Sequence, residues 1–148
     1  HPLLAFVPLQ VGESWTDGRK TVEALPAVHS VPAVGFAAWG SGGAWVFSGD
    51  TGRNPAFWAR VNRLPVAQLV IETAFSDRES ELARRSQHLS PGSLAEELVA
   101  IAPGSRYPIC ITHTKPAETE LIMDEIHRLD AAARHDIRWL AAGQVFEI

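Results

Sequence analysis

The sequence Ala44-Trp45-Val46-Phe47-Ser48-Gly49-Asp50-Thr51-Gly52 is the most informative part of this chain. Its apolar residues predict a β-strand, and the glycines around Asp50 predict a tight turn at the carboxyl end of that strand. A second apolar run, Pro108-Ile109-Cys110-Ile111-Thr112, ends in His113. A carboxylate and an imidazole at the ends of neighbouring strands can form half of a metal site that activates water. Asp50 and His113 are therefore the first candidate pair, although an aspartate in a glycine turn is also common without a function.

Length and composition favour one globular domain. The 148 residues are 46% hydrophobic and 20% charged, which is typical of a chain with a packed core. The net charge of −4 disfavours a broad nucleic-acid-binding surface, since such surfaces are basic. Cys110 is the single cysteine, which excludes an intrachain disulfide and a cysteine-rich zinc module. No apolar run reaches the roughly 18 residues of a membrane span, no signal peptide is visible, and a cytoplasmic protein is the simplest interpretation.

The order of the predicted elements is strands first, then strands alternating with helices. Apolar or alternating runs predict strands at residues 3–9, 20–26, 33–39, 44–48, 66–72, 108–112, 137–140 and 144–148. Helical spacing predicts helices at residues 54–62, 78–85, 93–101 and 117–133. The glycine-rich Gly40-Ser41-Gly42-Gly43 predicts a hairpin between two strands, and the last two strands are expected to pair. This order predicts an α/β fold with a mixed sheet.

Glu72 and His88 form a second candidate pair. Glu72 ends the apolar run 66–71, so it is either exposed at the sheet edge or held by a partner, since a lone buried carboxylate is costly. His88 precedes a predicted helix, where a histidine alone is more often a loop or capping residue. If the two side chains meet, the carboxylate orients the ring and raises its pKa. Such a pair suits a general acid that protonates a leaving alkoxide.

The remaining polar candidates are weaker. Lys115 and the helix that follows it could attract a phosphate. His29 lies in a loop, where a plain loop histidine and a catalytic one are equally compatible with the sequence. His127 and His135 fall on or just after the last predicted helix, on faces expected to be solvated.

Four sequence blocks, taken in order, resemble the metallo-β-lactamase superfamily. The similarity is greatest to its phosphodiesterase branch, which contains the class II cyclic-nucleotide phosphodiesterases and the tRNA 3′-end-processing endonucleases. The blocks are residues 28–36, 48–52, 71–75 with 88–91, and 111–116. His88-Leu89-Ser90-Pro91 and Thr112-His113-Thr114-Lys115-Pro116 favour the cyclic-nucleotide side.

The resemblance implies a fold, a reaction and a role for each candidate residue. The fold is the C-terminal half of a four-layer αβ/βα sandwich, with a mixed sheet and helices on one face. Asp50 is implied to bridge two metal ions, usually zinc and otherwise manganese or iron, and His113 to ligate one of them. Glu72 and His88 are implied to assist departure of the leaving oxygen. The implied reaction is hydrolysis of 3′,5′-cyclic nucleotides through a hydroxide held by the two ions.

The chain departs from that family in one large respect, because the main ligand cluster His-any-His-any-Asp-His is absent from the sequence. Residues 1–148 are therefore expected to form a single partial domain that is inactive alone. Its expected partners are a small phosphodiester and a complementary N-terminal half or second chain. Self-association is the other expectation, through an apolar sheet face built from Phe36, Trp45, Phe47 and Val70. The alternatives are a metal-free interaction domain and an RNA 3′-end endonuclease or other hydrolase of the superfamily.

Overall fold

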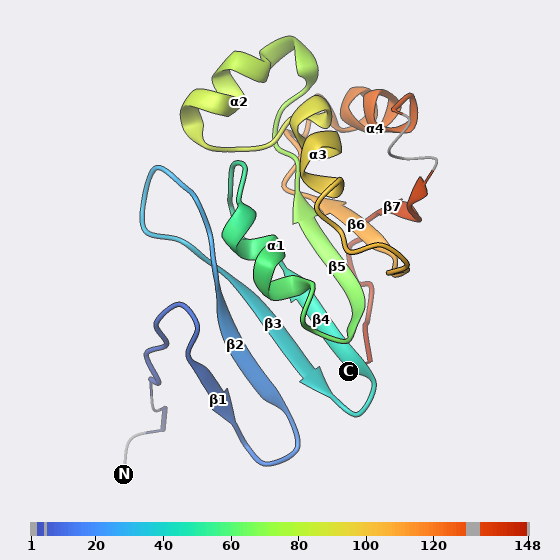
Figure 1. Cartoon of the computed structure of the whole chain (residues 1–148). Coiled ribbons are helices and arrows are strands. Elements are labelled where there is room, and N and C mark those ends of the chain that lie inside the picture. The colour runs from blue at the N-terminus through green and yellow to red at the C-terminus, as the bar shows by residue number, and fades with distance from the viewer. Residues whose placement is uncertain (1–2, 5, 130–133, 148) are drawn as a thin grey trace.

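The computed structural model describes residues 3–4, 6–129 and 134–147. Within these residues, seven strands form one mixed sheet in chain order (Figure 1). The strands are β1 (Ser14–Thr16), β2 (Thr21–Pro26), β3 (Val34–Gly40), β4 (Gly43–Phe47), β5 (Val66–Glu72), β6 (Ile109–Thr112) and β7 (Ile137–Trp139). Strands β1 to β4 pair antiparallel, and β4 to β7 pair parallel. The predicted α/β fold with a mixed sheet is confirmed.

The predicted hairpin joins β3 to β4, and β4 sets the direction in which the later strands run. Gly40 pairs with Gly43 across the turn. Gly43 has a φ of +97°, and a Cβ there would lie 2.9 Å from the carbonyl oxygen of Pro65, so only glycine fits. From β4 onward the strands run parallel, which brings their carboxyl ends to one edge of the sheet. That edge carries the residues that follow β4, β5 and β6.

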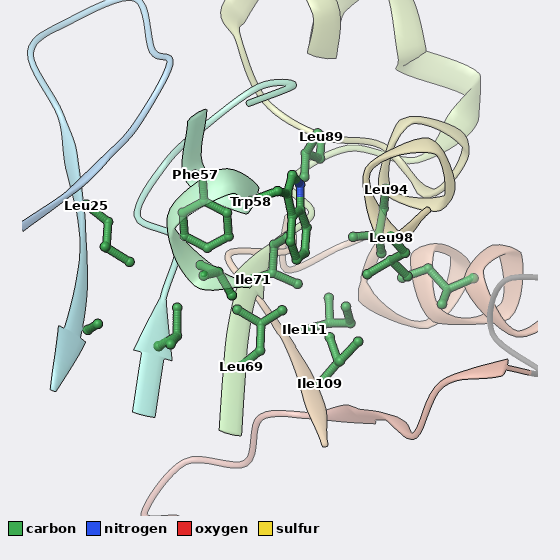
Figure 2. Close-up of a cluster of buried hydrophobic side chains, with 14 of the residues drawn as sticks. Leu25, Phe57, Trp58, Leu69, Ile71, Leu89, Leu94, Leu98, Ile109 and Ile111 are labelled. Atoms are coloured by element: carbon green, nitrogen blue, oxygen red, sulfur yellow. The ribbon is translucent and has the colours of Figure 1, made fainter. Parts of the chain in front are cut away.

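Helices cover one face of the sheet, as predicted. They are α1 (Pro55–Val61), α3 (Pro91–Leu98) and α4 (Thr119–His127). Helix α2 (Ser80–Ser86), preceded by the 3₁₀ turn η1 (Asp77–Glu79), instead packs Ala83 with Ala74 and Phe75 of the loop after β5. Side chains of α1, α3 and α4 pack with inward-facing residues of β2 to β6 in one core cluster. Figure 2 shows part of that cluster, including Leu25, Phe57, Trp58, Leu69, Ile71, Leu94, Leu98, Ile109 and Ile111. Each of these side chains stabilises the fold by about 1.5–3 kcal/mol through burial.

A buried carboxylate on α3 fixes helix α1 in place. Glu97 accepts hydrogen bonds from the backbone N–H of Asn54 and from the indole Nε1 of Trp58, both at 2.8 Å. The Asn54 side chain in turn accepts from the backbone N–H of Phe57 at 3.0 Å, which caps α1. The loop that leaves the Asp50 turn is thereby anchored to the helical layer.

The opposite sheet face carries aromatic side chains. Trp45 alternates with core residues along β4, and its ring stacks on Phe47 at 6.1 Å and contacts Phe146 at 6.2 Å between centroids. Phe36 is half-buried. Val70, which we expected to stand exposed in this face, is only 1% exposed, so the predicted patch is smaller. Phe146, in the segment after β7, covers one side of the Trp45 ring in this patch.

Several predicted boundaries are wrong. The described residues of 3–9 form no strand, and residues 144–147 form none either, because they pair with no strand of the described sheet. Strand β7 instead pairs parallel with β6. Helix α4 ends at His127, short of the predicted residue 133, and residues 130–133 lie outside the described residues. Strand β5 has the predicted bounds and is buried from Leu69 to Glu72.

No helix in the described part of the chain combines the length and the apolar character that crossing a membrane requires.

The two adjacent glutamates of α3 allow a matched test of the Glu97 anchor. We expect Glu97→Ala to lower the free energy of unfolding by about 2–4 kcal/mol, because two buried donors lose their acceptor. Glu96→Ala should cost less than about 1 kcal/mol, since Glu96 is 61% exposed and pairs only with Arg53 on the surface. Urea denaturation followed by circular dichroism measures both values. Equal losses in the two variants would contradict the anchor.

Candidate functional site

The turn after β4 presents Asp50 at the carboxyl edge of the sheet. Gly49 has a φ of +63°, and a Cβ at this position would lie 2.4 Å from the carbonyl oxygen of Val34. Only glycine permits this close approach to β3. The chain therefore turns sharply, and the Asp50 side chain emerges 44% exposed.

Asp50 meets His113, which follows β6. The distance from Asp50 Oδ1 to His113 Nδ1 is 3.1 Å. This is shorter than the roughly 4–6 Å that we predicted, and close to the roughly 3.4 Å between two ligand atoms on a tetrahedral zinc ion with bonds near 2.1 Å. We predicted that the two strands are neighbours, and this is wrong, because β5 lies between β4 and β6. His113 has a φ of +62°, a conformation that non-glycine residues seldom adopt and that concentrates at functional sites.

Lys115 does not point into this site as a free cation. Its Nζ donates to Glu79 Oε2 at 2.7 Å and lies 4.1 Å from the centroid of the Phe75 ring. The backbone N–H of Lys115 bonds to the carbonyl of Ala74 at 3.2 Å. Lys115 thus ties the loop after β6 to the loop after β5, and the phosphate-attracting role suggested by the sequence is not supported by its contacts.

Glu72 is fully buried at the end of β5 and is held by partners rather than exposed at the edge. Its Oε1 accepts from the backbone N–H of Thr51 at 2.9 Å and lies 2.7 Å from Nδ1 of His88. Its Oε2 accepts from the backbone N–H groups of Ala74 at 3.1 Å and Leu89 at 3.3 Å. The predicted contact between Glu72 and His88 is therefore present, and it fixes the orientation of the ring.

The protonation of this pair differs from our prediction. Burial raises the pKa of Glu72 to about 7, against the opposing effect of the three backbone donors. Burial also lowers the pKa of His88, as does the charge of the neighbouring His29. The predicted rise in the pKa of His88 is wrong, because burial and the charge of His29 outweigh the attraction of Asp50. Both shifts favour uncharged forms, namely a protonated Glu72 carboxyl and a neutral His88 imidazole.

His29 joins the site, which the sequence alone left open. Its ring centroid lies 4.7 Å from that of His88, and its Nδ1 lies 3.3 Å from the carbonyl oxygen of Gln87. Two hydrogen bonds hold its loop on the Asp50 turn: Val28 N–H to Thr51 Oγ1 at 2.9 Å, and Gly52 N–H to the Val28 carbonyl at 2.8 Å. The predicted β3–β4 hairpin could have revealed this contact, because in a hairpin the residues before β3 lie beside the residues after β4.

Two groups of side chains among the described residues could hold a metal ion. One consists of His29, Asp50 and His88, and the other of Glu72, His88 and His113, with the ligand atoms in each group within 4.8 Å of one another. Imidazole and carboxylate donors suit zinc, manganese and iron. The donor set fits a metal centre, but Asp50 and His113 alone are too few ligands for two ions.

Comparison with known proteins identifies the fold. No protein-family model and no curated protein matches the sequence. Among solved structures, the metallo-β-lactamase fold protein YhfI from Bacillus subtilis has a TM-score of 0.74 and 15% identity, and the match covers 95% of this chain and 55% of that protein. Human tRNase Z, short form (ELAC1), has a TM-score of 0.56 and 19% identity over 70% of this chain and 39% of that protein. CmlA, a diiron β-hydroxylase from Streptomyces venezuelae, has a TM-score of 0.63 and 15% identity over 90% and 33%.

At these identities the likeness establishes the fold alone. The chain has a metallo-β-lactamase fold and spans about half the length of the Bacillus protein and smaller shares of the other two. The predicted fold class is thereby confirmed as a fragment of that fold.

The protonation of His88 can be measured directly. In metal-free protein, we expect its ring to titrate below the reference value of about 6.5, because burial and His29 both disfavour the charged imidazolium. His29→Ala removes one of these causes and should raise the midpoint. The NMR signals of the histidine rings, followed over a pH series, give both values.

His127→Ala provides the control, since His127 is exposed on α4 and outside the cluster. It should leave the His88 midpoint unchanged. A wild-type midpoint above the reference value, or no rise in His29→Ala, would contradict this account of the pair.

Proposed function

We propose that this chain is the C-terminal part of a metal-dependent hydrolase that cleaves phosphodiesters, with 3′,5′-cyclic nucleotides as its substrates. One observation carries the proposal. The Asp50–His113 contact lies at the same sheet edge as the buried Glu72–His88 pair, and His88 approaches His113 with 5.3 Å between ring centroids. A ligand pair and a proton-holding pair side by side are the two parts that phosphodiester hydrolysis needs.

Asp50 and His113 are the metal ligands in this proposal. Both side chains are close to half exposed, at 44% and 47%, so they remain accessible to an ion and a substrate. When bound, two metal ions supply activation of the attacking water and neutralisation of charge on the phosphate. The remaining ligands come from a part of the fold that this chain does not contain, carried by the same polypeptide or by a second chain.

Glu72 and His88 deliver the proton in this proposal. The pair starts with one proton on Glu72, in the contact with Nδ1, and one on Nε2 of the His88 ring. As the phosphorus–oxygen bond breaks, its electrons go to the leaving oxygen, which takes the proton from Nε2. The Glu72 proton then moves to Nδ1. Glu72 ends as a carboxylate, which its three backbone N–H donors stabilise.

Charge and space support a small substrate. The chain has a net charge of −4, which disfavours a long RNA because RNA binding depends on neutralising phosphates. A cavity of about 640 Å³ is lined by His88, with Gly52, Ser80 and Ser93 among others, while Asp50 and His113 lie outside its lining. A cavity of this size matches a small ligand. The likeness to human tRNase Z favours the second candidate, an endonuclease acting on the 3′ end of RNA.

The complementary part of the fold is proposed to pack against the sheet face that carries Trp45, Phe47 and Phe146. These aromatic rings lie on the side away from the helices and contact one another. Aromatic side chains gathered on one face favour an interface. Self-association through the same face is the alternative arrangement.

The proton-delivery role predicts a dependence on the leaving group. In an assembly that carries the complementary part, we expect His88→Ala to slow hydrolysis of a cyclic nucleotide by about 10²–10⁴-fold, because its alkoxide needs a proton. Hydrolysis of bis(p-nitrophenyl) phosphate should fall far less, since nitrophenolate leaves without one. Steady-state kinetics of both substrates, with His127→Ala as the control, measure the difference. Equal losses on both substrates would contradict proton delivery.

The ligand role predicts a different pattern for Asp50. We expect Asp50→Ala to remove metal from the same assembly and to abolish turnover of both substrates, because no neighbouring residue replaces the carboxylate. Metal analysis and the same kinetic assays measure these effects. Full activity in this variant would overturn the proposed function. Cleavage of a 3′-extended tRNA without hydrolysis of cyclic nucleotides would support the endonuclease, and metal-free, inactive wild-type protein would support an interaction domain.

A further inference from the structure

We infer that a cavity at the amino ends of β6 and β7 binds a small organic phosphate, whose charge Arg106 and Arg134 hold. The cavity has a volume of about 990 Å³ and lies between the end of α3, the segments that enter the two strands, and the end of α4. It is at the edge of the sheet opposite the candidate functional site, because β4 to β7 run parallel. Its lining includes none of the four candidate residues Asp50, Glu72, His88 and His113.

Arg106, Arg134 and His135 form a basic wall of this cavity. Arg106 precedes β6, and the other two residues precede β7. The two segments are held together where the strands begin, since the backbone N–H of Ile109 donates to the carbonyl of Asp136 at 2.8 Å. Burial lowers the pKa of His135, and the charges of Arg106 and Arg134 lower it further. The guanidinium groups are thus close enough to the ring to oppose its protonation, and the wall carries two positive charges at neutral pH.

Two carboxylates in or beside the cavity bind other arginines. Glu96, which lines the cavity, lies 2.8 Å from Nη1 of Arg53. Asp136, which follows His135 in the chain, accepts from Nε of Arg138 at 2.8 Å. Both carboxylates are therefore engaged outside the basic wall, although the chain as a whole has a net charge of −4.

The guanidinium groups of the basic wall keep donors for a ligand. Nη1 of Arg106 donates to the carbonyl of Ser105 at 2.9 Å, and a guanidinium has five N–H donors. In the part of the chain that the structure describes, neither Arg106 nor Arg134 forms an ion pair. An anion is the ligand that complements such a wall.

The charge and the remaining walls define the chemical class of that anion. A phosphate monoester carries a charge of about −1.5 to −2 at pH 7, so it balances two guanidinium groups, whereas a carboxylate balances one. Arginine also binds phosphate through two parallel hydrogen bonds. The rest of the lining is largely apolar and includes Leu98, Val99, Ile101 and Leu129, which suits an organic group attached to the phosphate.

Titration of the metal-free 148-residue chain with 1-naphthyl phosphate, followed by calorimetry, tests the inference. This ester should bind at least about tenfold more tightly than inorganic phosphate, which lacks the apolar group, and than 1-naphthol, which lacks the charge. It should bind at least about threefold more tightly than 1-naphthoate, whose single charge balances one guanidinium. Equal affinity for 1-naphthol or for 1-naphthoate overturns the inference, because the cavity then does not select a phosphate.

Matched arginine variants locate the ligand. Arg106→Gln should weaken binding of the ester at least about tenfold, since it removes charge-assisted hydrogen bonds. Arg85→Gln is the control and should match the wild type, because Arg85 is exposed on α2 and outside the lining. Unchanged binding in Arg106→Gln, or an equal loss in the two variants, overturns the inference.

A further measurement on the wild type does not depend on the folding of a variant. The ring NMR signals of His135 should shift when 1-naphthyl phosphate is added, and the titration midpoint of His135 should rise, because the phosphate offsets the two guanidinium charges. The signals of His88 should stay in place. An ester that leaves His135 unchanged, or that shifts His88 instead, overturns the inference. None of these readouts involves metal or catalysis, so failure here leaves the proposed hydrolase activity separately testable.

Discussion

The site depends on the burial of one carboxylate. Glu72 is removed from water at the end of β5, where an unpartnered charge would destabilise the protein by several kilocalories per mole. The fold satisfies it with donors from three separate segments: the turn after β4, the loop after β5 and the loop that enters α3. Each of these segments carries or adjoins a candidate functional residue. The need to satisfy Glu72 therefore also positions Asp50 and His88.

The parallel half of the sheet supplies the second constraint. Strands β4, β5 and β6 run in the same direction, so whatever follows them must meet at one edge. Gly49 and His113 both have a positive φ, so the chain turns sharply after β4 and after β6. These turns keep the Asp50 and His113 side chains at this edge. Helices α1, α3 and α4 contribute rigidity rather than chemistry, because they pack on the inner face of the sheet and support the loops at its edge.

The functional groups at this edge suit proton transfer better than they suit the binding of two metal ions. It contains two histidines with oriented rings, one joined to a buried carboxylate, and a third histidine in contact with Asp50. Such a set can hold a proton and can bind one cation, but it does not provide the ligands of a two-metal centre. The chain covers 55% of the Bacillus protein and 39% of human tRNase Z, and the proposed function assigns the remaining ligands to a part of the fold outside it.

The sequence by itself determined the elements whose signals are local. The glycine tetrapeptide predicted the β3–β4 hairpin, and the polar residues that end apolar runs predicted the positions of Asp50, Glu72 and His113 at strand ends. A buried strand end also required a partner for Glu72, which led to His88. These inferences succeeded because each depends on neighbours in the chain or on the cost of burying a charge.

Only the tertiary structure decided the long-range facts. It inserted β5 between β4 and β6, brought His29 to His88, left residues 144–147 without a strand and placed Lys115 on Glu79. It also lowered the pKa of His88, which the sequence predicted to rise. The reason is common to all of them. Strand order, burial and the field of distant charges arise from contacts between segments far apart in the chain, and no local pattern of residues encodes them.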